Sequence, residues 1–280
     1  MPELPEVETV RTGLAPVFEN NKITDVRLAR PDLRFAFPVN FAKRLTGASG
    51  TKLWRRAKYL LLELDTGETL LSHLGMSGSY LVLANKQAPP DGRKPKHDHV
   101  VFEMQDGSQI IYNDPRRFGF MDLFATDKLK DCKFLKHLGP EPTGNVLSAS
   151  GLAPQLAKKK TPIKTALLDQ RLIAGLGNIY VCEVLFRSHL HPAKCCCDLS
   201  LAQIETMVGH IRDVIFEAIA AGGSSLNDFS NAKGELGYFQ HGFAVYDRMG
   251  LPCPTASCSG SIERMVQSGR SSFYCPKCQI

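Results

Sequence analysis

Four cysteines near the carboxyl end limit what this chain can fold into more than any other feature. Cys253 and Cys258 form one close pair, Cys275 and Cys278 form a second, and 16 residues separate the pairs. Four thiolates in this pattern can converge tetrahedrally on zinc and leave no coordination position open, so we expect a structural metal. A hairpin this small cannot bury a core, so the zinc would supply its folding free energy. The alternative interpretation is four unrelated buried thiols.

The segment between the two cysteine pairs predicts the tip of a hairpin. Gly269 favours a turn, and Arg270 follows it directly. An arginine at a hairpin tip is suited to reach a phosphate group, although taken alone it is equally consistent with a solvated side chain.

The other five cysteines carry weaker signals. Cys195, Cys196 and Cys197 are consecutive, and adjacent cysteines cannot easily share one metal ion. We interpret them as loop thiols that are open to oxidation. Cys132 and Cys182 are interpreted as small core residues.

Length and charge exclude several classes of protein. The 280 residues suffice for two domains with cores, and the formal net charge of +6 permits an anionic partner without requiring one. No apolar run approaches the roughly 20 residues of a membrane helix, so no membrane partner is expected. The start of the chain is acidic and lacks the apolar stretch of a signal peptide, which predicts a cytoplasmic protein. Nothing in the sequence requires more than a monomer.

The first part of the chain predicts an antiparallel β-sandwich with one helix attached. Residues 5–14 are typical of a helix, since proline suits its first turn and acidic residues its positive end. The stretches 59–64 and 69–74 flank one turn signal, and 100–104 and 109–112 flank another. A polar surface loop is expected over 85–95.

Helical periodicity replaces the strand pattern further along. Ser200 and Gln203 are typical of a capping box ahead of an apolar helix face, and Gly222 and Gly223 would end that helix. The glycine- and serine-rich stretch 222–240 predicts a loop. We therefore predict an α+β protein: a β-sandwich domain over 1–125, a linker over 126–150, a helical domain over 151–245 and a zinc finger over 246–280.

Six separate motifs resemble one family. They are MPELPEVETVR at the start, HLGMSG at 73–78, NDPRRFG at 113–119, LLDQRLIAGLGNIYVCE at 167–183, GELGYFQ at 234–240 and the cysteine pattern. In this order they resemble the bacterial formamidopyrimidine-DNA glycosylases of the Fpg/Nei family. The start resembles the formamidopyrimidine branch rather than the endonuclease VIII branch. One departure is the spacing from Cys253 to Cys258, which is longer than the usual two intervening residues but within the range that zinc tolerates.

The resemblance implies a fold and an activity. It implies a β-sandwich, a helix–two-turn–helix domain and a zinc-finger hairpin with one structural zinc. It also implies a bifunctional glycosylase and lyase of base excision repair, which removes formamidopyrimidine and 8-oxoguanine from damaged double-stranded DNA. Strand cleavage would follow by β,δ-elimination through an iminium on Pro2, after removal of Met1.

The resemblance also implies roles for individual residues. The catalytic residues would be Pro2 as nucleophile, Glu3 as proton donor, and Lys58 and Arg270 as aids to elimination, with Glu6 supporting the terminus. Met76, Arg116 and Phe118 would fill the gap left by an everted base. Phosphate contacts would come from His97, Lys159, Lys160, Lys164 and Asn178. Without the motifs, Met76 and Phe118 are equally consistent with core packing, Lys58 with a solvated strand edge and the lysine run with a solvated face.

Three other functions compete with this interpretation. A zinc-ribbon DNA-binding protein without catalysis would explain the charge and the cysteines but not the Pro2–Glu3 start. A terminal proline can also act as a general base, as in tautomerases, but those proteins are far smaller and need no zinc. A member of the same family could instead act on oxidised pyrimidines.

The cysteine pattern yields a direct prediction about metal content. The purified chain is expected to hold about one zinc ion, because four thiolates complete one tetrahedral site. Elemental analysis of the pure protein checks this, and protein that contains no metal would rule it out.

Overall fold

We describe the protein from a computed structural model, which describes residues 2–85, 94–224 and 239–280. Its contacts divide the chain into two compact units. The first unit runs to Lys136 and includes residues 221–224; the second comprises His137–Ala220 and Phe239–Ile280. Most of the loops predicted over 85–95 and 222–240 lie outside the described residues.

The first unit is built mainly from strands. Its elements are α1 (Leu4–Phe18), β1 (Ile23–Leu28), α2 (Phe41–Leu45), β2 (Gly50–Arg56), β3 (Tyr59–Leu64), β4 (Glu68–His73), β5 (Ser79–Leu83), β6 (Asp98–Met104), β7 (Gln109–Asn113) and β8 (Phe120–Ala125). Short 3₁₀ turns cover Pro95–His97 and Thr126–Asp131.

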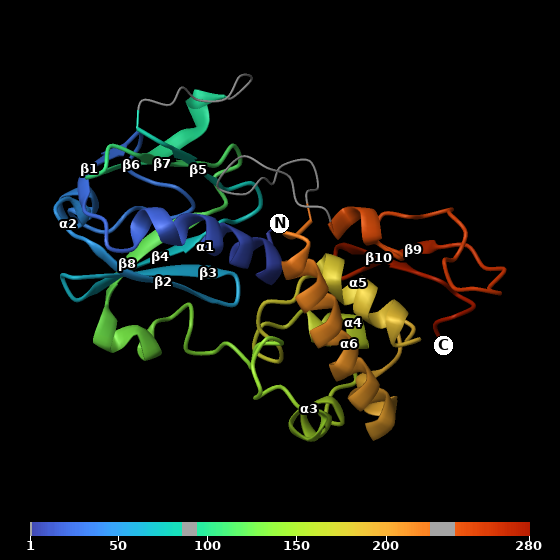
Figure 1. The fold of residues 1–280 in the computed structure, drawn as a ribbon. Helices are drawn as coiled ribbons and strands as arrows, with labels where there is room; N and C mark the ends of the chain where they lie inside the picture. Colours follow the sequence, from blue (N-terminus) through green and yellow to red (C-terminus); the bar gives the residue numbers. More distant parts are fainter. Residues whose placement is uncertain (1, 86–93, 225–238) are drawn as a thin grey trace. The chain divides into compact units, whose positions relative to one another are not determined.

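Two four-stranded antiparallel sheets form the predicted sandwich (Figure 1). One sheet has the strand order β1-β6-β7-β5 and the other β2-β3-β4-β8. Both predicted hairpins are confirmed, since β3 pairs with β4 and β6 with β7. The core between the sheets includes Leu60 and Leu62 from one sheet and Phe102 and Tyr112 from the other, all buried. Burial of this apolar surface is the main term that stabilises the unit.

Helix α1 completes the core of the sandwich. It is longer than the predicted 5–14 because Leu14 and Phe18 continue its apolar face into the core. The ring of Phe18 packs edge-on against Phe102, with centroids 5.4 Å apart. The start of the chain is therefore part of the packed structure of this unit.

The second unit is mainly helical. Its elements are α3 (Ala149–Leu156), α4 (Ile163–Leu167), α5 (Asn178–Arg187), α6 (Leu201–Ala220), β9 (Glu263–Gln267) and β10 (Arg270–Tyr274), with short 3₁₀ turns at Cys196–Asp198 and Phe239–Gly242.

Helix α6 begins and ends where the sequence predicts. The Ser200 amide donates to the Gln203 side chain (3.0 Å) and the Gln203 amide donates to Ser200 Oγ (3.2 Å), which makes the expected capping box. After Ala220, Gly222 and Gly223 both have positive φ angles. A helix commonly ends in this left-handed conformation, which glycine adopts without a Cβ penalty.

Strands β9 and β10 form the predicted hairpin. The turn between them consists of Ser268 and Gly269, with φ angles of 48° and 74°. Two positive φ angles match the twist of a two-residue hairpin turn. Arg270 pairs with Gln267 at the first position after the turn, so it lies at the tip.

A buried glutamate joins α5 to the segment after residue 239. Glu183 accepts hydrogen bonds from the amides of Ala244 (2.8 Å), Val245 (3.0 Å) and Tyr246 (2.8 Å). Burial raises the pKa of Glu183, and the three amide donors counteract that rise. This carboxylate is therefore the acceptor for three consecutive backbone N–H groups of the loop.

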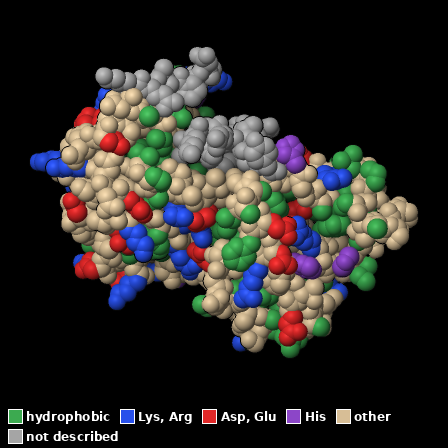
Figure 2. Space-filling view, viewed as in Figure 1, with side chains coloured by type: hydrophobic (Ala, Val, Ile, Leu, Met, Phe, Trp, Pro, Cys, Tyr) green, Lys and Arg blue, Asp and Glu red, His purple; other side chains and the backbone are tan. Residues whose placement is uncertain are grey.

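On the face drawn in Figure 2, Lys and Arg side chains are interspersed with Asp and Glu. Among the described residues, no helix is both long and apolar enough to cross a membrane.

The role of Glu183 can be tested by substitution. Glu183→Ala should lower the free energy of unfolding by about 3–5 kcal/mol, because it removes the acceptor of one buried and two part-buried backbone N–H groups. Glu205→Ala, at an exposed position of α6, is the control and should change stability by less than about 0.5 kcal/mol. Denaturant unfolding measures both, and equal losses would contradict the assigned role.

Candidate functional site

The first residues of the chain are buried and held by hydrogen bonds. Pro2 is buried, and Glu3 and Glu6 are each only 2% exposed. Glu3 is the N-cap of α1, and its amide donates to Glu6 Oε2 at 2.8 Å, within a capping box. The hydrogen bonds at the start of α1 therefore fix the backbone direction at Glu3, and with it the position of Pro2, which precedes the helix.

Glu6 also binds the segment that follows α6. Its Oε1 accepts hydrogen bonds from the amide of Ser224 (2.7 Å) and from Ser224 Oγ (3.0 Å). A Cβ on Gly223 would lie 3.0 Å from Glu6 Oε1, and its φ of 78° is strained for other residues. A glycine at 223 thus lets this backbone approach the glutamate closely.

The turn between β2 and β3 positions Lys58. Ala57 has a left-handed φ of 51°, and its carbonyl accepts a hydrogen bond from Arg55 Nη1 (3.0 Å). Arg55 also donates to Glu8 of α1 at 2.9 Å. Lys58 is only 6% exposed, so it is not the solvated strand-edge lysine considered above.

The ionisation of neighbouring groups reflects these contacts. Burial would raise the pKa of Glu8, but hydrogen bonds from Arg11 and Arg55 outweigh it and lower the pKa below its ordinary value. Burial, with the nearby positive charges of Lys58 and Arg34, lowers the pKa of His73 to about 4. His73 is therefore neutral at pH 7, and Glu8 is a carboxylate that ties α1 to β2.

Asp114 joins the two loops that carry the predicted gap-filling residues. It is fully buried and accepts hydrogen bonds from Ser77 Oγ (2.6 Å) and from the Gly119 amide (2.8 Å). The Arg116 amide in turn donates to Ser77 Oγ (3.1 Å). The HLGMSG and NDPRRFG motifs thus form one hydrogen-bonded structure, which fixes Met76 and Arg116 on adjacent loops.

Glycine is required where these two loops touch. Gly75 has a φ of 63°, and a Cβ there would lie 2.3 Å from the Gly119 amide nitrogen and from the Phe118 carbonyl carbon. Backbone atoms cannot move aside as a flexible side chain can. The close approach of the loops therefore depends on the missing side chain at 75.

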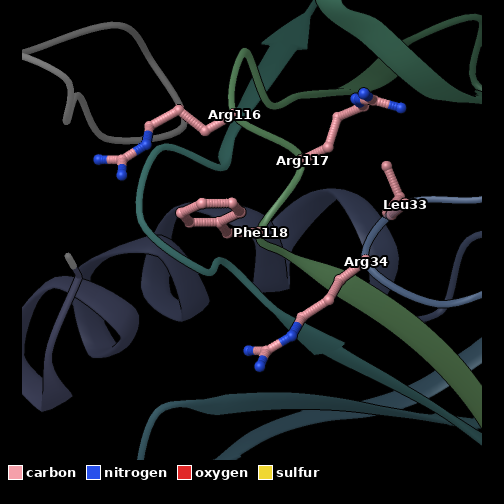
Figure 3. Close-up of a pocket in the computed structure, with 5 residues that line it drawn as sticks. All are labelled: Leu33, Arg34, Arg116, Arg117 and Phe118. Carbon is pink, nitrogen blue, oxygen red and sulfur yellow. The ribbon is translucent and has the colours of Figure 1, made fainter.

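A pocket of about 460 Å³ opens beside these loops. Figure 3 shows its lining: Leu33, Arg34, Arg116, Arg117 and Phe118. Phe118 is 44% exposed, and the Arg116 guanidinium lies 4.7 Å from the centre of its ring. An exposed phenylalanine does not fit the alternative of core packing.

Two other predicted DNA-contact residues of this unit, Met76 and His97, are half-buried. The His97 carbonyl accepts a hydrogen bond from the Asp114 amide (3.0 Å).

Two of the three arginines that line this pocket are not predicted from the sequence. Arg117 adjoins the recognised Arg116, and Arg34 comes from the segment after β1. The Arg34 amide donates to the Gly119 carbonyl (3.1 Å), which holds this segment against the motif loop. Three guanidinium groups around one pocket suit an anionic or hydrogen-bond-accepting ligand.

In the second unit, two predicted phosphate-binding residues hold the tip of the hairpin. Lys164 is fully buried, and its Nζ donates to the Ser271 carbonyl and to Ser272 Oγ, both at 2.7 Å. Asn178 Nδ2 donates to the same Ser271 carbonyl (3.0 Å). These bonds fix the residue that follows Arg270. The two bonds use two of the three N–H donors of the Lys164 ammonium group.

The remaining predicted contact residues of this unit are accessible. Lys160 and Arg270 are exposed, and Lys159 is half-buried. Asn178 is the first residue of α5, where unpaired backbone N–H groups and the helix dipole favour an anion.

The four cysteines of the hairpin region have the spacing of a zinc site. Cys253 Sγ lies 3.7 Å from Cys278 Sγ, and Cys258 Sγ lies 3.8 Å from Cys275 Sγ. A tetrahedral zinc with Zn–S bonds of about 2.3 Å places its sulfurs about 3.8 Å apart. A Cβ on Gly260 would lie 2.9 Å from Cys275 Sγ. A glycine at 260 thus leaves room for the sulfurs. The two measured distances show that four intervening residues between Cys253 and Cys258 still allow the four thiols to fit one zinc ion.

Known protein families match the β-sandwich, the helical region and the zinc finger of this chain. Three family models match in chain order: the formamidopyrimidine-DNA glycosylase N-terminal domain (residues 1–121), its H2TH domain (138–230) and the zinc finger found in FPG and IleRS (250–280). The chain thus has the domains of a DNA glycosylase of the helix–two-turn–helix class, with a structural zinc finger.

Whole proteins match over their full length. The chain is 54% identical to a formamidopyrimidine-DNA glycosylase of Rhodopseudomonas palustris and 55% identical to one of Cereibacter sphaeroides, with 100% of each protein covered. It resembles Lactococcus lactis Fpg in complex with DNA containing an abasic site (TM-score 0.88, 36% identity, 99% of both chains). A complex of the wild-type L. lactis protein with N7-benzyl-Fapy-dG DNA gives a TM-score of 0.89 at 35% identity, also over 99% of both chains. The chain belongs to the formamidopyrimidine-DNA glycosylase family.

The contact between the two motif loops can be tested with a pair of glycines. Gly47→Ala should cost about 1–2 kcal/mol, because Gly47 has a φ of 90° but nothing within 4 Å of the added Cβ. Gly75→Ala should cost about 1–3 kcal/mol more, since its Cβ also collides with backbone. Equal free energies of unfolding for the two variants would show that the loops do not need this close approach.

Proposed function

We propose that this chain is a bifunctional DNA glycosylase and lyase of base excision repair. Its substrate would be damaged double-stranded DNA that carries oxidised purines, namely formamidopyrimidines and 8-oxoguanine. The observation that carries the proposal is the placement of Pro2 and Glu3. Both are buried at the start of α1, in a turn that Glu6 holds by the Glu3 amide and by Ser224. We propose that the protein acts as a monomer in the bacterial cytosol, at the nucleoid.

Pro2 would be the nucleophile once Met1 is removed. A terminal α-amine has a pKa of about 8, so a useful fraction of it is neutral and nucleophilic at pH 7. The lysine side chain has a pKa of about 10.4, so almost all of it is protonated at this pH. The nitrogen forms a bond to C1′ of the sugar as the bond from C1′ to the damaged base breaks. The amine proton leaves with the base, which gives a covalent intermediate without a separate water nucleophile.

Glu3 would donate a proton in the next step. Its carboxylic acid protonates the sugar ring oxygen while the bond between this oxygen and C1′ breaks. The nitrogen lone pair of Pro2 then forms a double bond to C1′ and yields an iminium ion. Because proline is a secondary amine, this iminium has no N–H to lose, and its positive charge persists. A positioned proton donor of this kind contributes about 10²–10⁴-fold to rate.

The iminium would then promote strand cleavage. It acidifies the hydrogens on C2′, and loss of one of them expels the 3′ phosphate; a second elimination expels the 5′ phosphate. We propose that Lys58 assists the first elimination and Arg270 the second. The buried turn that holds Lys58 and the exposed hairpin tip that carries Arg270 are consistent with these roles.

Access to C1′ would require the damaged base to leave the helix. Base eversion costs a few kcal/mol, and filling the gap recovers part of that cost. The exposed Phe118 and the half-buried Met76 could act as apolar wedges, and Arg116 could hydrogen-bond the orphaned base, with a preference for cytosine. Asp114 and Gly75 hold the loops that carry all three residues.

Phosphate binding would come from both units. His97 in the first unit and Lys159, Lys160 and Asn178 in the second are proposed to contact the DNA backbone. Lys164 is proposed to contribute by holding the hairpin through Ser271 and Ser272. Several such contacts should make DNA binding fall steeply as salt concentration rises.

The variant Glu3→Gln tests the catalytic assignment. Glutamine keeps the shape of the helix start but has no acidic proton, so excision should fall by about 10²–10⁴-fold while binding to lesion DNA persists. Nicking and binding of duplex with 8-oxoguanine opposite cytosine measure the two effects. The control Glu205→Gln, at an exposed position of α6, should keep full activity.

Two outcomes would contradict the proposal. Near-normal excision by Glu3→Gln would remove Glu3 from the mechanism. If the protein nicked duplex with thymine glycol faster than duplex with 8-oxoguanine, its substrates would be oxidised pyrimidines and not oxidised purines. A second 8-oxoguanine duplex, with adenine opposite, tests the proposed preference for cytosine.

A further inference from the structure

Outside the proposed active site and the zinc finger, the described residues bring one further pair of thiols together. Cys195 is half-buried, Cys197 is exposed, and their sulfur atoms lie 3.0 Å apart. The cysteine between them is buried, and its thiol lies 4.0 Å from Thr161 Oγ1. The 3₁₀ turn at Cys196–Asp198 thus directs the first and third cysteines to one side and the second to the interior.

The spacing of this pair differs from the spacing in the zinc finger. The finger pairs lie 3.7 and 3.8 Å apart, which fits the edge of a zinc tetrahedron. At 3.0 Å, the sulfurs of Cys195 and Cys197 are too close to share a zinc ion at the usual bond length. Among the described residues, Asp198 is the only other possible metal ligand of this cluster, and its Oδ1 lies 3.5 Å from Cys197 Sγ. The geometry therefore favours a bond between the sulfurs over a shared metal.

We propose that Cys195 and Cys197 form a reversible thiol–disulfide site that hydroperoxides oxidise. The exposed Cys197 thiolate attacks one peroxide oxygen and becomes a sulfenic acid, and the other oxygen leaves as water. The sulfur of Cys195 then attacks the Cys197 sulfur and displaces the hydroxyl group, which leaves as a second water. Two thiols thus lose two electrons and two protons, and one hydrogen peroxide becomes two water molecules.

The backbone around the pair is anchored to the loop that carries two proposed phosphate-binding lysines. Cys195 forms an antiparallel bridge with Pro162, and the Cys196 amide donates to the Thr161 carbonyl (3.1 Å). The Cys195 thiol donates to the Lys159 carbonyl at 3.8 Å. These contacts hold Cys195 in place, so Cys197 is the residue that must move as the disulfide closes.

The first step is expected to be slow at neutral pH. The hydrogen bond with Cys195, together with the nearby Asp198 carboxylate, raises the pKa of the exposed Cys197 thiol to about 11. Since the thiolate is the nucleophile, only a small fraction of Cys197 reacts at any moment. Long exposure to peroxide is therefore the appropriate test condition.

Mass spectrometry of the zinc-loaded protein tests the proposal. After peroxide treatment and alkylation without reduction, the tryptic peptide between Lys194 and Arg212 should have lost two hydrogens and two alkylation sites. Dithiothreitol should restore both. Cys195→Ser and Cys197→Ser should abolish the loss, whereas the matched control Cys196→Ala should keep it, because the thiol at 196 takes no part.

Three outcomes would overturn the proposal. The same loss of two hydrogens in Cys197→Ser would show that a different pair reacts. Conversion of Cys197 to sulfinic or sulfonic acid without a disulfide would show that Cys195 does not reach it. A second zinc ion per chain that disappears in Cys197→Ser would make the cluster a metal site.

Discussion

The carboxylate of Glu6 fixes the position of the first residues of the chain. One of its oxygens accepts the Glu3 amide and the other accepts two hydrogen bonds from Ser224. Chain termini are usually among the most mobile parts of a protein, and a mobile amine would be a poor nucleophile. By tying the N-cap of α1 to a segment 218 residues away, Glu6 would hold the proposed Pro2 nucleophile in a fixed position.

Buried carboxylates recur as the anchors of this molecule. Glu6, Asp114 and Glu183 are all buried, and each accepts hydrogen bonds from another segment: from backbone amides in the case of Glu6 and Glu183, and from the Ser77 hydroxyl in the case of Asp114. Removing a carboxylate from water is costly, and several N–H donors are needed to offset that cost. Each of these carboxylates holds a loop whose backbone lies outside the helices and sheets. Such loops can carry functional side chains with the precision of regular elements.

Local signals in the sequence predicted several of the regular elements. The turn at Asp106 and Gly107 predicted the β6–β7 hairpin, and Ser200 with Gln203 predicted the start of α6. The chemistry of these signals is complete within a few residues, so it can be recognised without knowledge of the fold. The clustering of the four finger cysteines was predicted for the same reason, because metal geometry limits where each must lie.

Features that depend on distant segments could not be predicted. Lys164 follows a run of lysines that is typical of a solvated face, yet it is buried because Ser271 and Ser272 supply its hydrogen bonds. Arg34 gave no signal, because only the packing of its segment against Gly119 brings it to the pocket. The partnership of Glu6 with Ser224 likewise has no local signature. In each case the partner is chosen by the tertiary structure.

The proposed activity depends most on the identity of the nucleophile. Borohydride reduction during reaction with an 8-oxoguanine duplex should trap the iminium as a stable protein–DNA adduct, and peptide mapping should locate it on Pro2. The same chain with Met1 retained has no free imino terminus, so it should form no adduct and should not nick the duplex. Full nicking by the form that keeps Met1, or an adduct on any other residue, would contradict the account.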